Sequence, residues 1–253
     1  MQKFLAYDKL AREEHFVRMR TRRVAEIRLE QGLPAFPDLR DLESIRNRLH
    51  GILVGELQAM EGAGRTVCDF VEDVPWEFTM DMARQVWDES RHVEIYLQLL
   101  EHVAGYMGEY PETTLLWRCA CAQTPEERVA GVNRGLEGLA CDVFAQLIEL
   151  AKKLNDPLLE RAVEFVLADE ITHVRMGSKW LHELTENAPE RLLKALEYQK
   201  SIDERLHFGG VRQEAGSLDQ GTLAIASDVR REAGFSEAEI ARLVASTQRS
   251  PVY

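Results

Sequence analysis

Two short segments of the chain carry the same order of acidic and imidazole side chains, and a single glutamate precedes each at the same distance. The segments are Asp88-Glu89-Ser90-Arg91-His92 and Asp169-Glu170-Ile171-Thr172-His173. The interval from Glu56 to Glu89 equals the interval from Glu137 to Glu170. Residues three apart share one face of a helix, so the carboxylate and the imidazole of each Glu-x-x-His can reach one ion. Two lone glutamates and two Glu-x-x-His motifs are the donors with which four helices hold two metal ions.

This duplicated pattern predicts six metal ligands, namely Glu56, Glu89, His92, Glu137, Glu170 and His173. Four carboxylates match the charge of two divalent cations, and an oxygen-rich shell with imidazole suits iron or manganese better than structural zinc. The sequence therefore predicts two Fe ions, with a Mn/Fe pair as the alternative. A third Glu-x-x-His covers residues 204–207, but Ile171 occupies the upstream position where Glu204 would need its partner glutamate. We interpret that copy as a surface or lid feature.

Carboxylates next to the ligands are candidates for an outer shell, because a ligand imidazole usually donates its second N–H to such a group. We expect Asp88 to pair with His173 and Asp169 to pair with His92 across the bundle. Two further carboxylates, Glu61 and Asp142, each follow a proposed ligand by five residues. They are alternative ligands, outer-shell acceptors or polar positions off the core.

Residues that helical stepping places beside the ligands are predicted to line the site. The redox and pocket candidates are Tyr96, Ala59, Ala63, Ala140, Phe144 and Gly177, and the lining also includes Ile52, Gln85 and Val166. The small residues either open a pocket beside the metals or allow the helices to pack closely. Tyr96 either relays electrons or hydrogen atoms, or fills space in the core.

The apolar periodicity is helical almost throughout, which predicts an all-α protein. Residues 42–71, 77–106, 124–153 and 157–184 form the expected bundle helices, with Asn155-Asp156-Pro157 as a helix-start signal. The stretch from His92 to Glu137 is too long for a hairpin, so a long crossover of the ferritin-like kind should join two helix pairs. We predict an N-terminal helical segment over 1–40, the di-metal four-helix bundle over 41–185 and a helical extension over 186–253. The extension should hold a helix over 189–207 and another that a Ser236–Glu239 capping box opens.

The bulk properties narrow the class of protein. The net charge of −12 argues against nucleic acid as a partner, because phosphate binding needs a basic surface. No run of about 18 apolar residues marks a membrane span, and the first residues lack the layout of a signal peptide. We therefore expect a cytoplasmic protein with no membrane contact.

The ligand segments resemble those of the ferritin-like di-iron carboxylate superfamily, over residues 42–184. Gly55-Glu56-Leu57-Gln58-Ala59 is similar to the ligand helix of rubrerythrins, and residues 88–92 resemble the Asp-Glu-x-Arg-His motif of bacterial di-iron monooxygenases. Residues 50–61 and 169–180 are also similar to a poorly characterised bacterial ferritin-like family. Ala140 stands where rubrerythrins carry an additional Glu ligand, so peroxide reduction by their scheme is not expected.

The resemblance implies an O2-activating di-iron oxygenase or oxidase. Its partners would be O2, an electron donor of unknown identity and a small organic substrate that undergoes hydroxylation, N-oxygenation or desaturation. The alternatives are a peroxide-consuming catalase or peroxidase, a tRNA hydroxylase, and a non-catalytic metal-binding or ferroxidase protein. The C-terminal extension either covers the bundle mouth or embraces a second subunit, which allows a homodimer.

Overall fold

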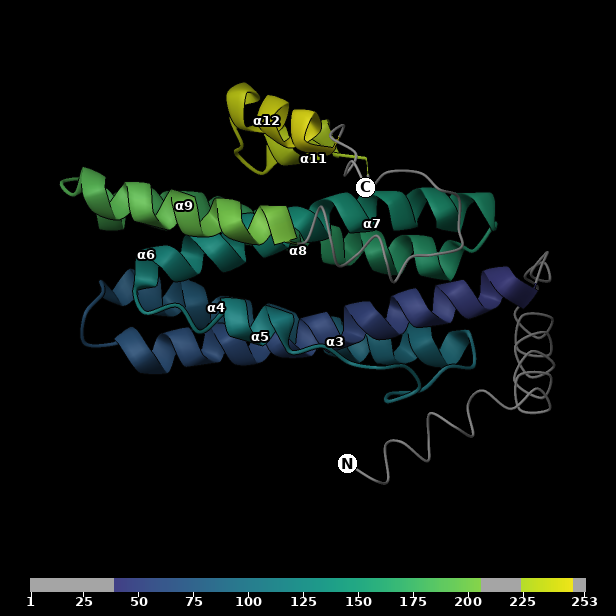
Figure 1. The fold of residues 1–253 in the computed structure, drawn as a ribbon. Coiled ribbons are helices and arrows are strands. Elements are labelled where there is room, and N and C mark those ends of the chain that lie inside the picture. The colour runs from purple at the N-terminus through teal and green to yellow at the C-terminus, as the bar shows by residue number, and fades with distance from the viewer. Residues whose placement is uncertain (1–38, 206–223, 248–253) are drawn as a thin grey trace.

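The computed structural model describes residues 39–205 and 224–247, and every regular element in these ranges is helical (Figure 1). Helix α3 (Leu39–Phe70) and helix α4 (Trp76–His102) form one antiparallel pair. Helix α7 (Glu137–Lys153) and helix α8 (Pro157–Thr185) form a second pair, and α4 packs against α8. The predicted all-α class is confirmed for the described residues, and α3, α4 and α8 lie within a few residues of the expected bounds.

Helix α8 begins where the sequence predicts. Asp156 precedes it, and one side-chain oxygen of Asp156 accepts a hydrogen bond of 3.2 Å from the backbone N–H of Leu159. Pro157 follows at the first helical position, where the missing N–H costs nothing because no intrahelical partner exists there. This start sets the register of α8 and so the level of its Glu-x-x-His.

The chain crosses between the pairs through residues 103–124, which include the short helix α5 (Leu115–Cys119). The side chain of Gln58 in α3 forms two hydrogen bonds with the backbone of this crossover. Its Nε2 donates to the carbonyl of Thr113 at 2.8 Å, and its Oε1 accepts from the backbone N–H of Trp117 at 3.0 Å. The expected long crossover is therefore present and lies against α3.

The third long helix is not the uninterrupted α-helix that the sequence predicts for residues 124–153. It consists of α6 (Pro125–Arg128), a π-helix η1 (Val129–Leu136) and α7, which begins at Glu137. A π-helix widens the turn and changes the directions of its side chains, and such segments are frequent at functional sites. Every residue of η1 is buried. This segment packs against α8 and α9.

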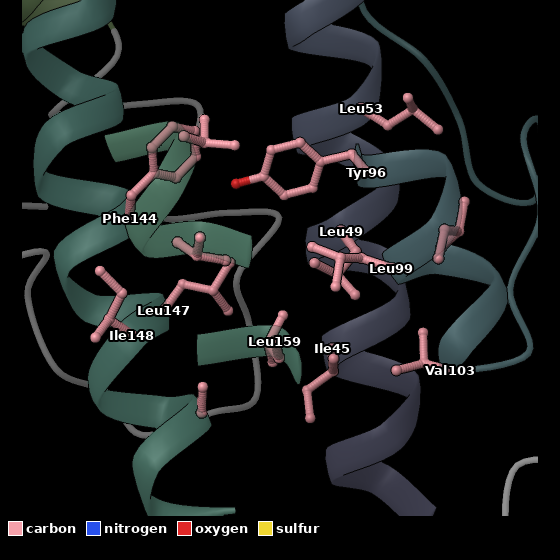
Figure 2. Close-up of a cluster of buried hydrophobic side chains, with 14 of the residues drawn as sticks. Ile45, Leu49, Leu53, Tyr96, Leu99, Val103, Phe144, Leu147, Ile148 and Leu159 are labelled. Atoms are coloured by element: carbon pink, nitrogen blue, oxygen red, sulfur yellow. The ribbon is translucent and has the colours of Figure 1, made fainter. Parts of the chain in front are cut away.

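The interior of the two helix pairs is apolar at both ends. One cluster fills the space between all four helices and includes Leu49, Tyr96, Phe144 and Leu159 (Figure 2). A second cluster, near the α3–α4 turn, is formed around Phe78 by residues of α4, η1, α8 and α9. Between the two clusters α4 buries polar residues instead, namely Gln85, Asp88, Glu89 and His92. The polar centre of the molecule is thus enclosed by hydrocarbon on two sides.

The described residues after 185 pack against the second helix pair (Figure 1). Helix α9 (Pro189–Arg205) lies along α6 and η1, and α11 (Ser227–Glu232) contacts α7 and α8 before α12 (Glu237–Thr247). The predicted capping box is present, because Ser236 N donates to Glu239 Oε2 at 2.8 Å and Glu239 N donates to Ser236 Oγ at 3.3 Å.

Some predictions fall on other parts of the chain. The N-terminal helical segment lies outside the described residues apart from 39–40, and so does His207 of the third Glu-x-x-His, whereas Glu204 is exposed on α9. The division into three segments stays a prediction. Within the described ranges, no helix is long and apolar enough to span a lipid bilayer.

Candidate metal centre

The six predicted ligands come together at the polar centre between the helix pairs. They form two overlapping sets, and in each set one donor atom per residue lies within 4.8 Å of all the others. The first set is Glu56, Glu89, His92 and Glu170, and the second is Glu89, Glu137, Glu170 and His173. All six residues are buried. Glu89 and Glu170 belong to both sets, so these two carboxylates lie where the sets meet and would be within reach of both ions.

Both imidazoles turn the same ring nitrogen toward the carboxylates. His92 Nδ1 lies 3.0 Å from Glu89 Oε2 and 3.3 Å from Glu56 Oε2. His173 Nδ1 lies 3.2 Å from Glu170 Oε2 and 3.3 Å from Glu89 Oε1. Nδ1 is therefore the nitrogen that each histidine presents to the centre.

The opposite ring nitrogens contact the predicted outer aspartates. His173 Nε2 lies 3.4 Å from Asp88 Oδ2, and His92 Nε2 lies 3.3 Å from Asp169 Oδ2. An ionised carboxylate only accepts hydrogen bonds, so Nε2 is the donor in both pairs, and Nδ1 is the nitrogen that would bind a metal once its proton is lost. Both pairings expected from the sequence are present in the structure.

Arginines extend this outer layer toward the surface. Arg84 Nε donates to Asp88 Oδ2 at 2.8 Å. Arg91 donates to Asp88 and, at 3.0 Å, to Asp169 Oδ2, so one guanidinium joins the two outer aspartates. Burial alone would raise the pKa of Asp88, but hydrogen bonds from His173 and Arg91 lower it to about 2. Asp88 therefore stays charged behind His173.

The concentration of acidic groups alters the protonation of the centre. Burial, reinforced by the neighbouring carboxylates, holds the pKa values of Glu56 and Glu137 well above the ordinary value. Burial opposes charge on His173, yet the carboxylates around it raise its pKa to about 10. Burial would also raise the pKa of Glu170, but the two imidazoles lower it below its usual range. Without cations, protons held by Glu56, Glu137 and His173 offset part of the negative charge of the centre.

The donor chemistry fits a pair of divalent ions. Four glutamates and two histidines balance two such charges, and carboxylate with imidazole suits iron or manganese. Glu170 Oε1 accepts no hydrogen bond of regular geometry from the described residues, and it lies 3.2 Å from His92 Nδ1. A buried carboxylate oxygen with this limited support, at the meeting point of both sets, is consistent with a metal ligand.

Two predicted outer-shell residues lie elsewhere. Glu61 is exposed, because five residues at about 100° each carry it well past the face of Glu56. Asp142 is fully buried but pairs with Arg230 of α11, whose Nη2 donates to Asp142 Oδ2 at 2.5 Å. Neither residue joins a ligand set in the structure. Of the roles expected for them, Glu61 fits that of a polar position off the core, and Asp142 is the partner of Arg230.

Some of the residues expected to line the site lie in the apolar core, and others allow helices to pack closely. Tyr96 and Phe144 belong to the larger apolar cluster, with ring centroids 5.8 Å apart (Figure 2). Within residues 39–205 and 224–247 the Tyr96 hydroxyl has no hydrogen-bond partner, and burial followed by the charges of Glu56 and Glu170 raises its pKa. Among the small candidates, Ala59 and Ala63 are buried, whereas Ala140 is half-buried.

At Gly177 the two interpretations can be separated. A Cβ added there would lie 2.4 Å from the Cβ of Asn133 in η1. Gly177 therefore serves close packing of α8 against η1.

Sequence reasoning missed Asn133, which contacts Gln85 at the edge of the ligand sets. Gln85 was expected to line the site, and its Nε2 donates to both Glu89 and Glu137. The signal that could have found Asn133 is its position four residues before Glu137, the same offset at which Gln85 precedes Glu89.

Comparison with known proteins gives a family and a distant relative. A family model described as "Protein of unknown function (DUF455)" matches residues 3–241. The chain is 28% identical over 165 residues to a protein of Haemophilus influenzae described as "Uncharacterized protein". That alignment covers 64% of this chain and 53% of the relative, so the chain spans about half the length of this curated relative.

Proposed function

We propose that this chain, which belongs to the DUF455 family, is a ferritin-like di-iron oxidoreductase that activates O2 to oxidise a small organic molecule. The observation that carries the proposal is the pair of overlapping Glu/His sets, buried and sharing Glu89 and Glu170. In the proposed four-helix bundle, α3 and α7 each contribute one glutamate and α4 and α8 each contribute a Glu-x-x-His.

A pair of iron ions held there would supply the reductive activation of O2, with Mn/Fe as the alternative composition. The residues of the chain perform the supporting tasks. The six ligands fix the ions between the helix pairs, and Asp88 and Asp169 orient the imidazoles by accepting their Nε2–H groups. The two apolar clusters keep bulk water away from the centre.

Metal content per chain after anaerobic reconstitution with Fe²⁺ tests the proposal. The wild type should hold about two irons. Glu56→Ala and His173→Ala should each lose metal, whereas Glu61→Ala, an exposed control on the same helix as Glu56, should not. Unchanged metal content in Glu56→Ala and His173→Ala would overturn the site.

Admission of O2 to the loaded protein then separates the enzymatic alternatives. A transient visible absorption band, followed by turnover of a substrate from a panel of small organic molecules, supports the oxygenase or oxidase. Vigorous O2 evolution from peroxide without substrate would favour a catalase instead. Many irons per chain in a large assembly would favour a ferroxidase, and hydroxylation of tRNA would favour the RNA-modifying alternative.

A further inference from the structure

The two halves of the chain repeat the metal ligands, but they differ in the residues that stand one helical turn before the ligand glutamates. The interval that separates Glu89 from Glu170 also separates Gln85 from Val166 and Ile52 from Asn133. Each of these last four residues stands four positions before a ligand glutamate. Two are polar and two are apolar, so one side of the centre has hydrogen-bonding support that the other lacks.

Gln85 supports the carboxylates of the second ligand set. Its Nε2 donates to Glu89 Oε1 and to Glu137 Oε1, each at 3.0 Å. Asn133 Nδ2 in turn donates to Gln85 Oε1 at 2.7 Å. Gln85 and Asn133 are 1% and 2% exposed, so water does not compete for these bonds.

The direction of both amides follows from one backbone group. Asn133 Nδ2 lies 3.4 Å from the carbonyl oxygen of His173, which can only accept. The nitrogen of the Asn133 amide must therefore face this carbonyl and the oxygen of Gln85. Gln85 then has its Nε2 turned toward the two carboxylates, and a flipped amide would place oxygen against oxygen.

Helix α8 leaves room for the hydrogen bonds between Asn133, Gln85 and the two glutamates, because it has a glycine opposite Asn133. Gly177 faces Asn133, and a Cβ there would lie 2.4 Å from Asn133 Cβ and 3.3 Å from the carbonyl oxygen of Val129. The residue that corresponds to Gly177 in the first half of the duplication is Tyr96. The Tyr96 ring belongs to the larger apolar cluster. On that side Val166 is buried in the larger apolar cluster and Ile52 packs against it.

We infer that Gln85, oriented by Asn133, is the positioning residue for the ion bound by Glu137 and His173, and that the two metal positions differ in affinity. The inference rests on the proposed di-metal function. Glu137 belongs only to the second ligand set, so its bond to Gln85 acts on that position. A carboxylate held in place before the ion arrives binds it more tightly than a carboxylate that must be ordered on binding.

Titration with Mn²⁺ alone, followed by the EPR signal of the free ion, tests the inference. The wild type should bind Mn²⁺ in two distinguishable steps. Gln85→Leu should weaken one step by about 10–100-fold and the other by a smaller factor, because the other set shares only Glu89 with Gln85. Gln98→Leu is the matched control, because Gln98 is exposed on the same helix and its side chain donates to Glu94, which is no ligand.

Asn133→Ala is a second variant that tests the same inference. It replaces Gln85→Leu if circular dichroism shows that Gln85→Leu does not fold. It should weaken the same step by a smaller factor, because Asn133 acts through Gln85. In the Gln85→Leu background it should then add little further loss. An additive loss, an equal fall in both steps or unchanged affinities would overturn the inference. Absence of Mn²⁺ binding by the wild type would instead remove the proposed metal site itself.

Discussion

Asp88 accepts hydrogen bonds from three side chains, those of His173, Arg84 and Arg91. The aspartate is fully buried, whereas the side chain of Arg84 is 58% exposed. The ligand imidazole is therefore separated from a solvent-facing guanidinium by a single carboxylate. This arrangement lets the protein keep a charged group behind the metal centre without leaving it unpaired in a low-dielectric interior.

Asp88→Asn should lower the affinity of the centre for Mn²⁺ by about 10–100-fold, because the neutral amide polarises His173 less than a carboxylate does. The free-ion EPR signal during Mn²⁺ titration measures the effect. Glu94→Gln, on an exposed position of the same helix, should leave the affinity unchanged. Equal affinities for wild type and Asp88→Asn would show that the contact at Nε2 does not tune this ligand.

At this scale the sequence was informative because the chemistry is local. Glu-x-x-His and its preceding aspartate can be recognised without knowledge of the tertiary structure, and the repeated interval places the partner glutamates at one level. Asn133 was not predicted, since its role depends on Gln85 and Gly177 from two other helices. For Glu61 and Asp142 the sequence left several roles open, because spacing alone does not show which side chain each one meets.

The π-helix η1 shows how an element responds to its neighbours. Its eight residues stand between α6 and α7 and bring Asn133 toward the centre while Glu137 begins the next α-helix. The bounds of the α-helices followed from caps and apolar periodicity, as at Asp156 and Ser236. The change of helix type did not, because caps and apolar periodicity carry no signal that distinguishes this π-helix, which contacts α8 and α9, from an α-helix.

Gly177→Ala should destabilise the protein by about 1–3 kcal/mol, because the new methyl group collides with Asn133 where the helices meet. Urea denaturation gives the free energy of unfolding. Gly51→Ala in α3 is the control, since a Cβ there meets nothing within 4 Å. The control should be neutral or stabilising by up to about 1 kcal/mol, because Ala is the better helix former. A neutral Gly177→Ala would contradict the close approach of α8 and η1.

Helices α6 and α9 are joined by a charge pair with a definite pH dependence. Arg191 donates from Nε and Nη2 to the two oxygens of Glu126, each at 2.7 Å. Burial would raise the pKa of Glu126, but these bonds lower it below the ordinary value. Because the pKa is lower in the folded chain, the stabilisation is complete above the ordinary value of about 4.3 and is lost as pH falls through the folded value.

Glu126→Gln should therefore lower the melting temperature at pH 7 and have a smaller effect in acid, below the folded pKa of Glu126. The expected loss at pH 7 is about 1–3 kcal/mol, the range for a hydrogen bond to a charged group. Thermal unfolding of both proteins over this pH range measures it. A difference between them that stays constant with pH would contradict the lowered pKa.

Across the whole molecule, the helices after residue 224 are held to the second helix pair by buried arginines. Arg230 of α11 bonds to Asp142, and Arg134 of η1 bonds to Glu239 of α12. Both guanidinium groups also lie over the ring of Phe235, at 4.9 and 4.8 Å from its centroid. The sequence predicted the final helix and its capping box, but nothing local in it showed where that helix docks.

Arg230→Met should destabilise the protein by about 3–5 kcal/mol, because Asp142 is left as a buried charge without its cation. Arg230→Met combined with Asp142→Leu should recover much of this loss, since the pair is then replaced by hydrocarbon. Guanidinium denaturation of the two variants and the wild type measures both effects. Equal stabilities for the single and the double variant would show that the charge pair does not hold α11 in place.

The docking of α11 also affects how this protein can be shortened. Asp142 lies five residues after Glu137, so a chain cut before Arg230 would carry an uncompensated acid inside the same helix that presents a ligand. Loss of metal by such a fragment would not show that α11 and α12 cover the centre. A fragment that also carries Asp142→Leu would test whether the removed C-terminal residues cover the centre, because it has no buried acid that depends on Arg230.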